Sequence, residues 1–85
     1  MVPLVQLDLG QVGLVRSVRG GHRLMSRLAA LGFTPGAPVR VMRNHGFGPI
    51  IVSVRGAQIA LGRGEAGRVL VHPAMEGNDE VVDAV

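Results

Sequence analysis

The sequence contains no cysteine, and this absence excludes disulfide bonds, thiolate zinc sites, iron–sulfur clusters and cysteine nucleophiles together. Lysine is also missing, because all nine basic residues are arginine. A phosphate-loop lysine and Schiff-base chemistry are therefore excluded as well. Trp and Tyr are absent and only Phe33 and Phe47 carry a benzene ring. The core must therefore consist mainly of Val, Leu, Ile, Ala and Met, which favours a Val-rich β domain.

Long apolar runs are missing too. No stretch approaches the ~18 consecutive apolar residues that a membrane-spanning helix needs, so no direct membrane insertion is expected. The first residues are apolar, but they carry no early positive charge and are interrupted by Pro3, Asp8 and Gly10. We therefore expect no secretory signal and a cytoplasmic location. A length of 85 residues leaves room for one small core.

Acidic residues are scarce in most of the chain and concentrated at its end. Residues 1–75 carry nine Arg against Asp8 and Glu65, a formal charge of +7, whereas the last ten residues carry −4. These last residues are polar and show no usable apolar period. The sequence therefore predicts a basic domain over residues 1–74, followed by an acidic flexible C-terminal tail over residues 75–85.

Glycines and prolines separate short apolar runs at close spacing, a pattern typical of short strands joined by tight turns. Residues 62–67 are expected to form a loop or a single helical turn. Strands are predicted at residues 11–19, 39–43, 50–55, 58–61 and 68–72, and a helix at residues 22–31. Because so many short strands leave edges that must be protected, we predict an all-β fold with small α content, a closed five-stranded barrel with one short helix.

The predicted helix has an apolar face formed by Leu24, Leu28 and Leu31, at positions i, i+4 and i+7. We expect Leu28 and Leu31 to seal one end of the barrel. Gly32 follows directly, as expected for a residue with positive φ that ends a helix.

Two strand patterns carry further expectations. The alternation in residues 11–19 breaks after Leu14, which predicts a β-bulge or a strong bend. In the next predicted strand, Val39, Val41 and Arg43 are expected to face the same way because strand side chains alternate.

Catalytic and metal-binding patterns are not found. His22, His45 and His72 are too far apart in sequence for short-range metal-ligand spacing. Asp8 and Glu65 are the only carboxylates before the tail, so paired acid–base catalysis is poorly supported. We therefore predict no enzyme activity, no catalytic residue, no cofactor and no metal site.

A loop between two predicted strands carries the candidate binding residues. Phe47 lies between Gly46 and Gly48, where its apolar ring either packs back on the domain or contacts a partner. We predict a partner-binding site at this hairpin tip, with Phe47 as its apolar anchor, His45 beside it and Arg43 supplying charge at its base. The arginines are dispersed and aromatic residues are few, so nucleic acid is not the expected partner.

The sequence resembles the ferrous iron transport protein A family (FeoA) over residues 7–71. The resemblance is strongest in the string RLAALGFTPG at residues 27–36, followed by the Gly48-Pro49 hairpin and by ALGRG at residues 60–64. It implies an SH3-like β-barrel in the cytosol that has no catalytic activity and assists FeoB, a GTPase-bearing ferrous iron permease. Related barrels occur in metal-dependent repressors. The hairpin tip at residues 44–49 departs from many relatives, which have a somewhat longer loop.

Taken with the residues themselves, the resemblance leads to one expected function and one alternative. The expected function is a non-catalytic accessory protein of bacterial ferrous iron uptake that binds and modulates a FeoB-like transporter from the cytosolic side. The alternative is a small basic barrel that acts as a nucleic-acid-binding or metal-regulator-type interaction domain. Whether the chain also forms a homo-oligomer stays open. No ligand set for iron is found in the residues.

Overall fold

The computed structural model describes residues 1–74 of the chain. The predicted flexible tail, residues 75–85, lies outside the described residues, so the domain boundary stays a prediction. In chain order the elements are β1 (Val2–Pro3), the 3-10 helix η1 (Leu4–Gln6), β2 (Val12–Val18), α1 (His22–Ala30), β3 (Pro38–Arg43), β4 (Ile50–Val54), β5 (Ala57–Leu61), α2 (Arg63–Ala66) and β6 (Val69–Pro73).

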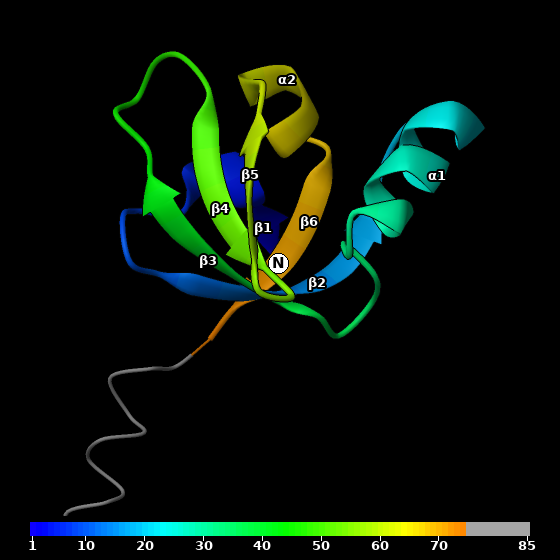
Figure 1. The fold of residues 1–85 in the computed structure, drawn as a ribbon, viewed down its shortest axis with the longest axis horizontal. Coiled ribbons are helices and arrows are strands. Elements are labelled where there is room, and N and C mark those ends of the chain that lie inside the picture. Colours follow the sequence, from blue (N-terminus) through cyan, green and yellow to red (C-terminus); the bar gives the residue numbers. More distant parts are fainter. Residues whose placement is uncertain (75–85) are drawn as a thin grey trace, which may run out of the picture.

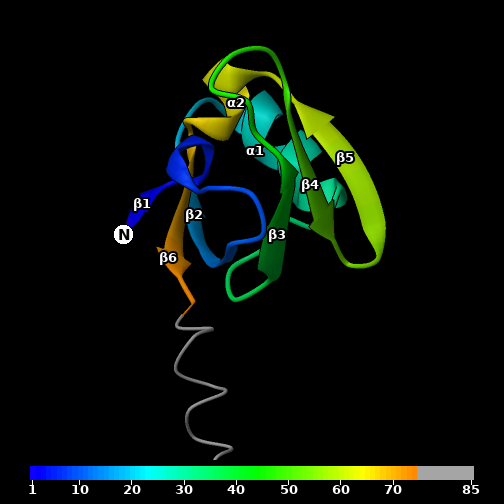
Figure 2. The ribbon, with the colours of Figure 1, turned by 90° about the vertical axis from the view of Figure 1, so that its left-hand side faces the viewer.

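The six strands of residues 1–74 form one antiparallel sheet in the order β1-β6-β2-β3-β4-β5. The sheet curls around its own core, with α1 to one side and α2 at one end (Figure 1, Figure 2). The predicted β architecture with one short helix is confirmed, and the expected single helical turn is α2.

The predicted number of five strands is wrong, because the sequence analysis missed β1. This strand has only two residues, one of them a proline, so it shows no periodicity that a sequence pattern could detect. Its pairing with β6 is what defines it, through Val2 opposite Val71 and Pro3 opposite Leu70.

Two bulges decide which side chains face the core. In β2 the register shifts between Val15 and Ser17, which confirms the predicted bulge. In β3 the register shifts between Val41 and Arg43. Arg43 therefore pairs with Ile51 on the outer face of the sheet, and the expectation that Arg43 shares a face with Val41 is wrong. An alternation argument counts residues, so it fails wherever a bulge inserts one.

The helix α1 covers the core through Leu28, which is completely buried. The expectation that Leu31 also seals the barrel is wrong, because Leu31 is 39% exposed. The helix ends at Ala30, and Gly32 turns the chain with a φ of +109°. Phe33, whose N–H donates to the Leu28 carbonyl at 3.0 Å, is buried instead.

Aliphatic side chains from both ends of the described chain form one core. Leu4 and Leu7, which precede β2, were not predicted as core residues. The buried residues of the core are Leu4, Leu7, Val15, Leu28, Phe33, Ala37, Val39, Val41, Ile50, Val52, Val54, Leu61, Ala66, Val69 and Val71.

Within residues 1–74, no helix is long and apolar enough to cross a membrane.

Candidate partner-binding site

The loop of residues 44–49 joins β3 to β4 and extends beyond the sheet at the end where α2 lies (Figure 1). It contains the predicted His45 and Phe47, and Arg43 closes the strand before it. The sequence expectation of a loop between two paired strands is confirmed.

The base of this loop is held by Asn44, a residue that the sequence analysis did not single out. Its side-chain Nδ2 donates to the carbonyl oxygens of Val5 at 3.0 Å and Leu7 at 2.8 Å. Its Oδ1 accepts the N–H of Gly46 at 3.1 Å. This last contact is an Asx turn, whose signal in the sequence is Asn directly after a strand and two residues before Gly. Asn44 therefore fixes the loop to the segment that follows β1.

A second attachment comes from α2. Arg63 Nη1 donates to Asn44 Oδ1 at 3.0 Å and to the Gly48 carbonyl at 3.3 Å. Arg63 thus contacts both ends of the loop, although it lies after β5 in the chain. Sequence spacing gives no signal for this contact, because it depends on how α2 folds over the end of the sheet.

The tip of the loop exposes an aromatic pair. Phe47 is 74% exposed, and its ring centroid lies 6.2 Å from that of His45 with an interplanar angle of 33°. Of the two alternatives drawn from the sequence, packing back on the domain is therefore not what the structure shows. The ring of Phe47 is thus exposed at the tip of a loop whose base is held by Asn44 and Arg63.

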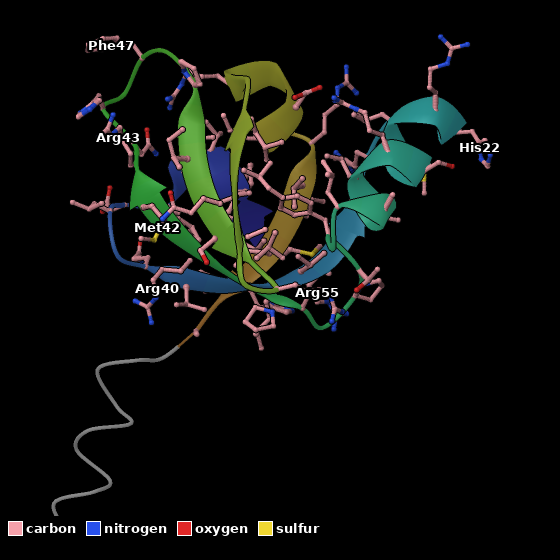
Figure 3. The ribbon with its side chains drawn as sticks, in the orientation of Figure 1. His22, Arg40, Met42, Arg43, Phe47 and Arg55 are labelled. Carbon is pink, nitrogen blue, oxygen red and sulfur yellow. The ribbon has the colours of Figure 1, made fainter. Side chains whose placement is uncertain are left out.

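The outer face of the sheet continues below the tip. Arg43 lies on the same side of the molecule as Phe47, with Met42 nearby (Figure 3). Met42, Arg43, Ile51 and Gln58 line a shallow cavity of about 410 Å³. Met42 is 39% exposed, so this face combines an apolar centre with positive charge.

The charge of the described domain is positive and largely uncompensated. Residues 1–74 contain nine Arg and two acidic residues, Asp8 and Glu65. Glu65 forms an ion pair with Arg27, which joins α2 to α1. Within the described residues, no three His, Cys, Asp or Glu side chains gather in a group that could hold a metal ion. The described domain is therefore strongly basic.

Comparison with known proteins identifies the family. The model of the FeoA domain family matches residues 2–73. A Methanocaldococcus jannaschii protein described as an Fe(2+) transport protein A is 35% identical over 79 residues, which are 93% of this chain and 95% of that protein.

Solved structures agree with the family match. An iron uptake regulatory protein (FeoA) is 44% identical with a TM-score of 0.81, and the match covers 86% of this chain and 97% of that chain. The FeoA of Stenotrophomonas maltophilia, solved with zinc and described as an SH3 domain protein, is 34% identical with a TM-score of 0.76 over 84% of this chain and 89% of that chain. The described domain is thus SH3-like, and the chain belongs to the FeoA domain family.

Proposed function

We propose that this chain is a non-catalytic accessory protein of bacterial ferrous iron uptake, which acts in the cytoplasm by binding and modulating a FeoB-like membrane transporter. Family membership supports the link to ferrous iron, since the Methanocaldococcus jannaschii relative is described as an Fe(2+) transport protein A. The transporter itself is part of the proposal.

The observation that carries the proposal is the exposure of Phe47 on a loop with a fixed base. The side chain of Phe47 is apolar and 74% exposed, so its transfer from water into a partner's surface is favourable. Because Asn44 and Arg63 hold the loop through hydrogen bonds, little loop entropy is lost when a partner binds. Burying the rest of the ring contributes about 2 kcal/mol, or about thirtyfold in affinity.

Positive charge defines the other property of the partner. Arg43 lies at the base of the loop, and the described domain has a formal charge of +7 from nine Arg and two acids. The partner surface is therefore expected to be acidic around an apolar pocket for Phe47. Exposed charge pairs add at most about 1 kcal/mol each and mainly increase the association rate at low salt.

Calorimetric titration of the chain with the cytosolic part of the cognate FeoB-like transporter tests this site. Phe47→Ala should weaken binding about thirtyfold and leave the unfolding midpoint unchanged. The matched control is Met25→Ala, which removes another exposed apolar side chain, 45% exposed and located on α1. Equal affinity of the Phe47→Ala variant and the wild type would contradict the proposed anchor.

The alternative function, nucleic-acid binding, is tested by a parallel titration of the chain with DNA. Binding to duplex or single-stranded DNA that weakens steeply with salt, together with no binding to the transporter, would favour the nucleic-acid interpretation. We expect no such binding at physiological ionic strength, because the arginines are dispersed along the chain and Phe47 is the single exposed ring of the described phenylalanines.

A further inference from the structure

Within residues 1–74, the strand β5 forms a free edge of the sheet. It is last in the strand order, and Figure 2 shows it along one border of the molecule. Natural edge strands are usually protected by charge, proline, a bulge or very short length. The opposite edge, β1, has such protection because it is two residues long and contains Pro3. Residues 57–61 contain neither charge nor proline, and their pairing with β4 runs without a bulge.

The register shows which backbone groups this edge presents. Val54 and Ala57 pair across a two-residue turn, in which Arg55 has a φ of +50° and Gly56 a φ of +83°. The residues that flank such a turn form a hydrogen-bonded pair, and hydrogen-bonded pairs then alternate along the ladder. The N–H and C=O groups of Gln58 and Ala60 therefore point away from β4, toward the free edge.

Charge at both ends of β5 indicates what this edge can bind. Arg55 precedes the strand and donates to Thr34 Oγ1 at 2.8 Å, while Arg63 follows the strand and donates to Asn44 Oδ1 at 3.0 Å. Both acceptors are neutral, so neither charge is compensated by these bonds. A second copy of the chain would place two domains against each other that each carry a formal charge of +7 over residues 1–74, which disfavours direct contact between the domains.

We propose that β5 binds an extended acidic segment of the partner protein, which adds to the sheet as a further strand. The backbone groups of Gln58 and Ala60 supply the main-chain hydrogen bonds, and the two flanking arginines select acidic side chains. This inference deepens the proposed function, on which it rests for the identity of the partner. Arg63 also donates to the Gly48 carbonyl in the loop of Phe47, so this arginine links the end of β5 to that loop.

Amide hydrogen exchange followed by NMR tests the geometry directly. In the free chain, the amide hydrogens of Gln58 and Ala60 should exchange fast, while that of Ile59 is protected by β4. A short blocked peptide of alternating Glu and Val should slow exchange at Gln58 and Ala60 about tenfold or more at low ionic strength. The corresponding peptide of Lys and Val should have no effect. No change at either amide with the acidic peptide at saturation would overturn the proposal.

The variant Ala60→Pro removes one outward N–H, and the ladder to β4 does not use this group. It should weaken peptide binding about tenfold, whereas the control Ala60→Ser, which keeps the N–H, should bind like the wild type. Equal binding by both variants would contradict strand addition. If Ala60→Pro does not fold, the exchange measurement on the wild-type chain decides alone.

The same exchange measurement with the cytosolic part of the transporter separates this inference from the proposed function. Transporter binding without protection of Gln58 and Ala60 would refute strand addition and leave the function standing. Peptide binding with protection, but no binding to the transporter, would support the strand-addition site and refute the proposed partner. Concentration-dependent protection in the chain alone would instead assign the edge to a second copy, and so would overturn the proposal.

Discussion

Replacing Asn44 by Ala should destabilise the domain more than its partly exposed position suggests. The side chain makes four hydrogen bonds, to the carbonyls of Val5 and Leu7, from the Gly46 N–H and from Arg63. Each such bond contributes about 1 kcal/mol net, and the bond to a charged donor contributes more. Because water replaces part of this loss at a half-exposed site, we expect a decrease of about 2–3 kcal/mol in the free energy of unfolding.

That loss is large for this chain, since a domain of its size has a total stability of about 4–10 kcal/mol. Urea denaturation followed by circular dichroism measures it. With a slope of about 1 kcal/mol per molar for so small a protein, the midpoint should fall by about 2–3 M. His45→Ala, the exposed neighbour, is the control and should change stability by less than about 0.5 kcal/mol. A midpoint for Asn44→Ala equal to that of the wild type would show that the loop is not held as described.

Three further predictions concern the helix α1, the turn that follows it and the C-terminal residues. Leu28→Ala empties a completely buried position and should cost about 2–5 kcal/mol, whereas Leu31→Ala, at a side chain that is 39% exposed, should cost less than about 1 kcal/mol; equal urea midpoints would contradict the helix packing. Gly32→Ala places a Cβ at a φ of +109° and 3.0 Å from Arg55 Cδ, so a loss of more than about 1 kcal/mol is expected in the same assay, and none would be inconsistent with this turn. Deletion of residues 76–85 should leave the melting temperature unchanged and strengthen binding of an acidic partner at low salt. A melting temperature lower by many degrees would show that the predicted domain boundary is wrong.

Much of the fold followed from local pattern. A strand was predicted at residues 50–55, and β4 spans Ile50–Val54, with Ile50, Val52 and Val54 buried. The break after Leu14 predicted the bulge in β2. These features succeed because the side-chain period of a strand is set by its own backbone.

The features that were missed depend on residues far apart in the chain. β1 exists only through its pairing with β6, and Leu31 turned outward because Phe33 occupies the core position after the helix. The second bulge, which moves Arg43 to the outer face, was identified only from the pairing of β3 with β4. Long-range pairing and packing decide such cases, and a local pattern does not contain them.

The candidate site was predicted in part. The sequence placed His45 and Phe47 in a loop between two strands, with Arg43 before it, and left open whether the ring of Phe47 packs back; the structure shows that this ring is 74% exposed. The role of these residues in partner binding stays a prediction. Asn44 and Arg63, which fix the loop, were missed because their partners are on distant segments. The sequence therefore located the tip, and the structure supplied the reason for its rigidity.

Binding to the transporter can be measured by co-purification of the chain with the cognate full-length FeoB-like transporter. The transporter is captured from detergent-solubilised membranes in parallel samples with and without guanine nucleotide and ferrous iron, and bound chain is measured after washing at low ionic strength. We expect the chain to be retained in at least one of these conditions, and we expect Phe47→Ala, but not Met25→Ala, to reduce the retained amount strongly. Absence of the wild-type chain from the transporter fraction in every condition would contradict the proposed function.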